Sequence, residues 1–355
     1  MTTTTTATGS SSLRESWTLV SPAPRSLRSF LVASAANANG NETASTNGIL
    51  KCGTGASDSD SAADVIAREL GLIKRLHLMT KQHSTPVALP ILAHGIDPLF
   101  GHSRRPWFIT PQAPATLADV SPGFVATYAR DLATSLLYVL QLVHTHHAMI
   151  HRDLRPATIA LQGGTDGVPP SLVLLGWDAA VALPSAPASD APIHFIDLAS
   201  IPPAAKLATR GRLDRTAFWS LRAHRTGGPT CPADDVEAGL LALAAAMQPS
   251  GWLPWALDPS TGAPYTESPA DAGSDADWSA ARSPFLTALE GRKWQAPVSH
   301  LPHVPKWLGE ALTRVRALAV GEMPPYSALR GVCAKGARRM RPTSTMSIAS
   351  VRSQM

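Results

Sequence analysis

The side chains best suited to chemistry lie in one short segment, His151-Arg152-Asp153-Leu154-Arg155. Asp153 offers a carboxylate that can accept a proton from a hydroxyl group, and Arg155 offers a permanent cation two residues later. A base and a cation in one loop are the side chains that phosphoryl transfer asks of a protein. The segment therefore predicts a site for that reaction.

A second pair of charges lies upstream. Lys51 follows the apolar residues Ile49 and Leu50, and Glu69 lies 18 residues later at the head of an apolar-periodic stretch. If Lys51 lies on a strand and Glu69 on the following helix, the two charges can form an ion pair. The alternative is that both are ordinary surface charges.

Several histidines gather near the same loop: His144, His146, His147 and His151. They straddle a predicted helix end and have no cysteine partner, so we assign no metal to them. We expect His151 to pack inside the loop and the other three to lie at the surface.

Composition limits the classes of function. The chain has 355 residues, of which 44% are hydrophobic and 16% charged, with a formal charge of +5. This mild basicity does not indicate a nucleic-acid partner. Three widely spaced cysteines suggest a reducing compartment. No apolar run approaches the roughly 20 residues that span a bilayer, and no secretory signal is evident. We expect an intracellular protein, cytoplasmic or nuclear, with no membrane association.

Segment patterns predict one domain, 13–336, between a disordered tail at 1–12 and a basic Ser/Thr-rich tail at 337–355. Strands are expected within 17–60, at 87–93 and at 107–110, and in a hairpin that turns at 163–167. Helices are expected at 62–79, 121–148, 235–247, 305–320 and 325–338. The expected class is α+β, with a small β-rich lobe at 13–112, a larger helical lobe at 113–336 and an insertion loop at 258–283.

These motifs resemble those of eukaryotic protein kinases over about 45–335. His151–Ile159 is similar to the kinase catalytic loop, and Gly176-Trp177-Asp178 stands in place of Asp-Phe-Gly. Three later stretches resemble the casein kinase 1 and vaccinia-related branch, namely 218–239, Leu253-Pro254-Trp255, and the closing 315–330 with its Glu-x-Pro-x-Tyr-x-x-Leu-Arg pattern. The resemblance implies a bilobal protein-kinase-like fold.

The resemblance also implies roles for individual residues. Asp153 would be the catalytic base, and Arg155, where kinases have lysine, would contact the transferred phosphate. Lys51 and Glu69 would bind ATP, and Thr110 and Gln112 are assigned to the same nucleotide site. Asp235 would brace the catalytic-loop backbone, and Trp177 would pack against His151 and the helix of Glu69.

The sequence departs from the kinase pattern at the metal-binding positions. Thr158 stands where kinases have a metal-binding Asn, and Gly176 stands where they have a metal-binding Asp. No G-x-G-x-x-G precedes Lys51, and the nearest candidate, Ala33–Gly40, has one glycine. We therefore predict no metal ligand, with Mg²⁺ bound only if Asp178 substitutes, and ATP binding that is weak or independent of metal.

Two functions follow from this contrast. The first is a pseudokinase that acts as a binding or regulatory scaffold for a protein partner, with weak or absent phosphoryl transfer; some vaccinia-related members with a similar Gly-Tyr-Gly are regarded as such. The alternative is an active, atypical Ser/Thr kinase that transfers phosphate from ATP to protein hydroxyls. A third reading is a fold that survives without a role.

Overall fold

The computed structural model describes a large part of the chain: residues 17–22, 29–34, 47–52, 59–83, 85–97, 105–113, 115–163, 169–183, 196, 213–226, 228–258, 260–264, 289–293, 301 and 303–335. Both predicted tails and most of the predicted insertion loop lie outside these residues. The chain divides into two compact units, Met1–Ala113 and Pro114–Met355.

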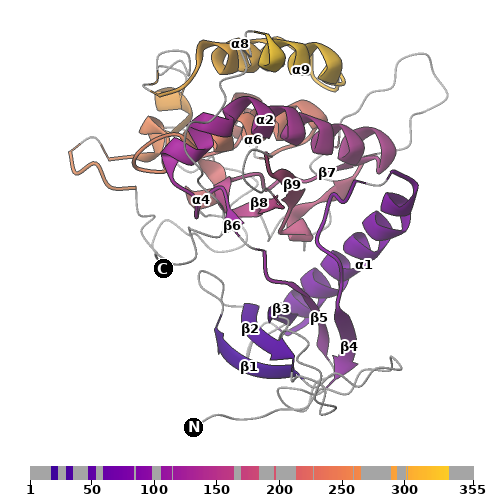
Figure 1. The fold of residues 1–355 in the computed structure, drawn as a ribbon. Helices are drawn as coiled ribbons and strands as arrows, with labels where there is room; N and C mark the ends of the chain where they lie inside the picture. Colours follow the sequence, from indigo (N-terminus) through magenta and orange to yellow (C-terminus); the bar gives the residue numbers. More distant parts are fainter. Residues whose placement is uncertain are drawn as a thin grey trace, which may run out of the picture. The chain divides into compact units, whose positions relative to one another are not determined.

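The first unit is built on an antiparallel sheet with the strand order β1-β2-β3-β5-β4 (Figure 1). Its strands are β1 (Trp17–Pro22), β2 (Ser29–Ser34), β3 (Asn47–Cys52), β4 (Ala93–Asp97) and β5 (Arg105–Pro111). One long helix, α1 (Ser59–His83), contacts β5 and β3. Buried side chains of the helix and of β5 form the core between them: Val65, Ile66, Ile73, Leu76, Trp107, Phe108 and Ile109.

The strand predicted at 87–93 is displaced in the structure, because β4 begins at Ala93. Val87 and Ala88 are buried, which explains the apolar pattern. Pro90 follows them and has no backbone N–H to donate to a sheet, so the ladder starts only after it.

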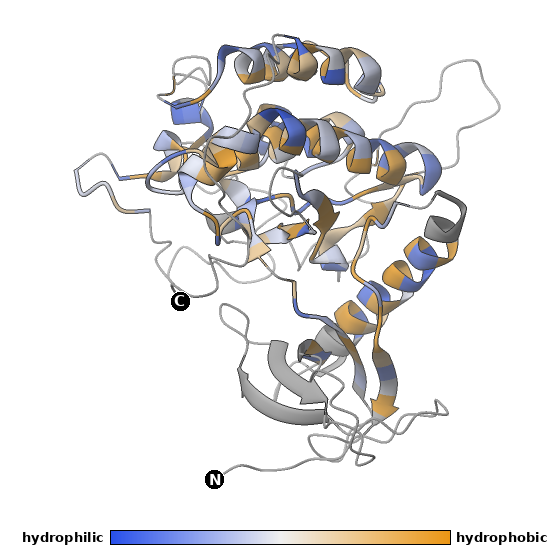
Figure 2. Cartoon of the chain, in the orientation of Figure 1, coloured by the Kyte–Doolittle hydropathy of each residue, from blue (hydrophilic) through white to orange (hydrophobic). Residues whose placement is uncertain are grey.

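The second unit is mainly helical. Its long helices are α2 (Pro122–Gln141), α6 (Pro232–Ala246), α8 (Lys306–Arg316) and α9 (Tyr326–Ala334). Helix α2 contacts α6 and α9, and α8 contacts both α6 and α9. Helix α6 is buried along its whole length, and hydrophobic residues accordingly dominate it, whereas α2 alternates hydrophobic and hydrophilic residues (Figure 2). The predicted helix at 121–148 ends earlier, since residues 142–146 form a π-helix, η1 (Leu142–His146).

Short strands and turns of the second unit carry the candidate loop. β7 (Met149–Ile150) pairs with β10 (Val181–Ala182), and β8 (Ile159–Gln162) pairs with β9 (Ser171–Leu174) and with β6 (Ala115–Thr116). The 3₁₀ turns η2 (Pro156–Thr158), η3 (Trp177–Ala179) and η5 (Pro254–Ala256) and the short helices α4 (Leu213–Thr216) and α5 (Leu221–Thr226) complete the unit. The predicted antiparallel hairpin is therefore confirmed, and the candidate residues lie where β7 and β9 end.

No helix among the described residues is long and apolar enough to cross a membrane. The three cysteines are free thiols, and each of them is buried.

Candidate phosphoryl-transfer site

A buried carboxylate from α6 fixes the backbone of the candidate loop. Asp235 accepts hydrogen bonds from the backbone N–H groups of His151 (2.5 Å) and Arg152 (2.8 Å). The Nε2 atom of His144 lies 3.0 Å from the same carboxylate, and Nδ1 of His144 contacts the hydroxyl of Tyr326. Because a carboxylate only accepts, Nε2 carries the proton and Tyr326 donates to Nδ1. The predicted bracing role of Asp235 is thus confirmed in the structure.

Electrostatics agree with an ionised Asp235. Burial acts to raise the pKa of Asp235, but the hydrogen bonds that it accepts from His144 and from the backbone of His151 hold the pKa below its usual value. The relay from Tyr326 through His144 to Asp235 thus connects α9 and the π-helix to the loop. Four donors therefore belong to one hydrogen-bond network whose side chains are all buried.

Arg152 links the loop to two further segments. Its backbone has a positive φ of 69°, which is uncommon for a residue with a side chain. Its buried guanidinium donates to the carbonyls of Pro229 (2.9 Å) and Ala179 (3.2 Å). These hydrogen bonds hold the loop against η3 and against the segment before α6.

His151 and Trp177 form the aromatic floor of the loop. Their ring centroids lie 4.6 Å apart in an edge-to-face arrangement, so the predicted packing of this pair is confirmed. The backbone N–H of Asp153 donates to Nδ1 of His151 (3.3 Å). Burial lowers the pKa of His151 to about 4, against smaller opposing effects of Asp235 and Asp178, so the ring is neutral at pH 7.

Thr158 serves the loop backbone. Its hydroxyl donates to the carbonyl of Asp153 (2.7 Å) and accepts from the N–H of Arg155 (3.0 Å). The side chain is buried. A hydroxyl with both partners inside the loop closes the η2 turn and is not directed to a ligand.

The two candidate carboxylates are bound by arginines. Oδ1 of Asp153 lies 3.2 Å from Nε of Arg155, and its Oδ2 lies 3.4 Å from Nη1 of Arg215. Nη2 of Arg215 lies 3.6 Å from Oδ2 of Asp178. The guanidinium of Arg215 therefore bridges Asp153 and Asp178, and the two arginines balance the charge of the two aspartates.

Gly176 lies beside this cluster in a left-handed conformation, with a φ of 73°. A Cβ atom at this position would lie 3.4 Å from Cγ2 of Thr158, 3.6 Å from Oδ1 of Asp178 and 3.9 Å from Oδ2 of Asp153. The missing side chain would thus project among the residues that could bind a ligand.

In the first unit, β3 and α1 bring Lys51 and Glu69 together. The Nζ atom of Lys51 lies 2.6 Å from Oε1 of Glu69, whose side chain is buried, and 5.8 Å from the centroid of Phe108. The predicted ion pair is confirmed, while its contact with a nucleotide stays a prediction. Thr110 is buried in β5, and Gln112 is exposed just after that strand.

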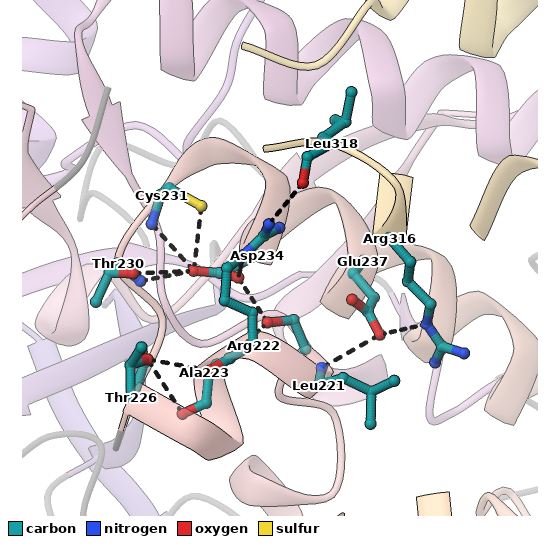
Figure 3. A network of polar contacts seen from close by, with 12 residues as sticks. Leu221, Arg222, Ala223, Thr226, Thr230, Cys231, Asp234, Glu237, Arg316 and Leu318 are labelled. Carbon is teal, nitrogen blue, oxygen red and sulfur yellow. Dashed lines mark hydrogen bonds and ion pairs between the residues drawn. The ribbon is translucent and has the colours of Figure 1, made fainter. Parts of the chain in front are cut away.

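A second buried network fixes the segment before α6 (Figure 3). Asp234 accepts hydrogen bonds from the hydroxyl of Ser220 (2.6 Å), from Nε of Arg222 (3.0 Å) and from the backbone N–H groups of Thr230 (2.8 Å) and Cys231 (3.1 Å). Cys231 is the N-cap of α6, and Asp234 in the first turn accepts from its backbone N–H.

Comparisons with known proteins can now be set beside this geometry. No protein-family model matches the chain, and no curated protein matches it. The solved structure of vaccinia related kinase 3 matches with a TM-score of 0.57 and 17% sequence identity, over 90% of this chain and 86% of that one. The chain has a protein-kinase fold. The predicted fold class is therefore confirmed, and the match falls in the group that the later motifs suggested. A likeness at this identity concerns the fold, so activity must be argued from the residues.

Two expectations about this kinase fold were wrong or incomplete. His144 and His147 are buried, not at the surface, whereas His146 is exposed. His144 could be buried because Asp235 and Tyr326 satisfy both of its ring nitrogens. Sequence reasoning also missed Arg215, since an isolated arginine far along the chain carries no signal of its contact with Asp153.

The arrangement limits the chemistry of the second unit. Asp153 is placed on a rigid loop, as a base must be, but both of its oxygens already contact guanidinium groups. Among the described residues, no cluster of three or more His, Cys, Asp or Glu side chains could hold a metal ion. The cluster has the charges of a phosphoryl-transfer site without its usual metal ligands.

Proposed function

We propose that this kinase-fold chain is a pseudokinase, a binding or regulatory scaffold for a protein partner, with weak or absent phosphoryl transfer. The observation that carries the proposal is the ion-pair cluster of Asp153, Asp178, Arg155 and Arg215. Its carboxylates are neutralised by side chains of the chain itself, where phosphoryl transfer requires metal ions.

The residues present do not fit a magnesium ion. Mg²⁺ prefers about six oxygen ligands in octahedral geometry, usually with carboxylates among them. Here Gly176 offers no ligand, the hydroxyl of Thr158 bonds the loop backbone, and Asp178 contacts Arg215. Substitution by Asp178, the alternative that sequence analysis left open, is therefore disfavoured.

Nucleotide binding depends on the first unit. The Lys51–Glu69 ion pair supports an interaction with phosphates, and we assign Thr110 and Gln112 to the same nucleotide site. Residues 23–28, which join β1 to β2, contain no glycine. Without glycines the backbone N–H groups approach phosphates poorly. We infer that ATP binds weakly and without a metal requirement.

The proposal is tested by phosphate transfer to casein from labelled ATP with Mg²⁺ or Mn²⁺, beside a thermal-shift titration with ATP in the presence and absence of each metal. We expect no transfer above background and no metal-dependent shift. Lys51→Ala should lower any ATP-dependent shift, and Lys74→Ala, which removes an exposed lysine of α1, is the matched control.

The second candidate is an active, atypical Ser/Thr kinase. It is favoured by the paired Lys51 and Glu69 and by the fixed loop that carries Asp153. Metal-dependent transfer that Asp153→Asn abolishes would establish this alternative and refute the pseudokinase proposal.

The scaffold role predicts a protein partner. Affinity capture of the full chain should recover the same protein repeatedly, and purified components should reconstitute the complex with wild-type chain and with Asp153→Asn alike. Failure to reconstitute any complex would favour a fold that survives without a role.

A further inference from the structure

The backbone beneath Arg215 is fixed on several sides. The carbonyl of Arg215 accepts from the N–H of Phe218 (3.1 Å), and the carbonyl of Ala217 accepts from Nε1 of Trp255 (3.0 Å). The buried ammonium group of Lys293 donates to the carbonyl of Trp219. Residues 216–220 are all buried, so the fold itself delivers the guanidinium to its position.

The guanidinium is well suited to replace a metal ion between two carboxylates. It reaches Asp153 through Nη1 (3.4 Å) and Asp178 through Nη2 (3.6 Å), and the side chain is only 11% exposed. An arginine stays protonated at any physiological pH, and its planar fork can engage two acceptors at once. Partial burial strengthens these attractions relative to exposed ion pairs.

Charge balance sets the consequence for metals. Asp153 and Asp178 contribute two negative charges, and Arg155 and Arg215 contribute two positive ones. A divalent cation would meet two guanidinium groups at close range. Loss of Arg215 would remove one of these positive charges and make the two carboxylates more attractive to a cation.

We propose that Arg215 is a built-in counter-ion that keeps divalent metal ions from Asp153 and Asp178. The inference deepens the proposed function and rests on it, because it names the residue that suppresses metal binding in a pseudokinase. The lack of metal ligands at Gly176 and Thr158 does not by itself exclude a metal ion, because the carboxylates of Asp153 and Asp178 remain. The proposal assigns the exclusion of the metal ion to Arg215.

The test measures Mn²⁺ binding to the full chain, without nucleotide, by electron paramagnetic resonance of the free ion. Arg215→Gln, which removes the charge but keeps most of the length, should bind one Mn²⁺ at least about tenfold more tightly than the wild type. Adding Asp178→Asn to Arg215→Gln should abolish the gain, because it removes one of the two ligands.

Two controls separate the bridge from a general change in charge. Arg225→Gln removes an arginine from α5 whose partner is Glu290 (3.0 Å), and it should leave Mn²⁺ affinity unchanged. Arg215→Lys keeps the positive charge and should gain far less affinity than Arg215→Gln. A gain of equal size in Arg225→Gln would overturn the inference.

A measurement on the wild type keeps the inference testable if Arg215→Gln does not fold. Wild-type chain and Asp153→Asn/Asp178→Asn should bind Mn²⁺ equally weakly; tighter binding by the wild type would refute the role of Arg215. The proposed function fails on a different readout, metal-dependent transfer to casein. If the chain transfers no phosphate and Arg215→Gln gains no Mn²⁺ affinity, the inference is refuted while the proposed function stands.

Discussion

Two buried aspartates, Asp153 in the candidate loop and Asp235 beside it, have different kinds of partners. Asp235 accepts from backbone N–H groups of His151 and Arg152 and from His144, all of them fixed in place. Asp153 instead contacts the ends of two long arginine side chains, Arg155 and Arg215, which are 18% and 11% exposed. The hydrogen-bond frame around Asp235 thus consists of backbone groups and a buried imidazole, whereas the partners of Asp153 are side chains that keep some contact with water.

The difference separates contacts that support the fold from contacts at the candidate site. The frame around Asp235 stabilises the fold whether or not phosphate is transferred, so its loss would cost stability. The arginines around Asp153 satisfy a charge that the fold does not otherwise need. Identical substitutions at the two aspartates should therefore have very different effects.

The largest effect is expected from Asp235→Asn. The substituted amide keeps only one acceptor oxygen, and its NH₂ group takes the place of the other. This NH₂ group then faces an N–H donor, either that of Arg152 or those of His151 and His144, and cannot accept a hydrogen bond from it. We expect a loss of about 3–5 kcal/mol in the free energy of unfolding, measured by urea denaturation. Asp131→Asn, at an exposed position of α2, should change it by less than about 0.5 kcal/mol. Equal midpoints for the two variants would contradict the rigid frame.

The second effect concerns pH. Burial lowers the pKa of His151 to about 4 in the folded chain, against 6.5 for the free side chain. Between pH 6.5 and pH 4 the imidazole is protonated in the unfolded chain and neutral in the folded chain. The free energy of unfolding therefore falls by up to about 3 kcal/mol as the pH drops through this range. His151→Phe keeps an aromatic ring against Trp177 and should flatten this dependence between pH 6.5 and 4. Parallel stability curves for the variant and the wild type would refute the assignment.

A smaller effect is expected at the far end of the relay. Tyr326→Phe removes the hydroxyl that donates to Nδ1 of His144 and leaves that nitrogen buried without its donor. The expected loss is about 1–2 kcal/mol in the free energy of unfolding. Tyr138→Phe, on the partly exposed ring of α2 (41%), is the control. A loss no greater than that of the control would show that the relay does not support the frame.

The smallest effect is expected from Asp153→Asn. Its arginine partners, which are 18% and 11% exposed, keep some contact with water, so the free energy of unfolding should change by about 1 kcal/mol or less. Differential scanning calorimetry beside Asp235→Asn gives the comparison directly. A loss as large as that of Asp235→Asn would mean that both aspartates belong to one rigid frame.

The sequence predicted the frame better than the site. Apolar periodicity located α1 and α2 because their buried faces repeat along the chain, and a long apolar stretch located α6, which is buried along its whole length. The resemblance of the segments around Lys51 and Glu69 to a kinase strand and helix predicted their ion pair, which the structure contains. Asp235 and Trp177 followed from motif positions and were found in the predicted contacts.

The remaining features depend on tertiary contacts that leave no local pattern. Arg215 meets Asp153 and Asp178 only because the turn at Phe218 and Trp219 is buried. His144 looks like a surface histidine until its two partners are known. Thr158 appeared to be a poor metal ligand, and the structure shows that its hydroxyl instead closes the loop.

The conformation and surroundings of Gly176 determine which other residue this position can accept. Aspartate is among the few residues besides glycine that tolerate a left-handed backbone. The nearest neighbour of a new Cβ, the methyl group of Thr158 at 3.4 Å, is at ordinary contact distance. A β-carbon therefore fits beside Asp153 and Asp178, and the cost of an aspartate at this position would come from the left-handed backbone and from repulsion by the two neighbouring carboxylates.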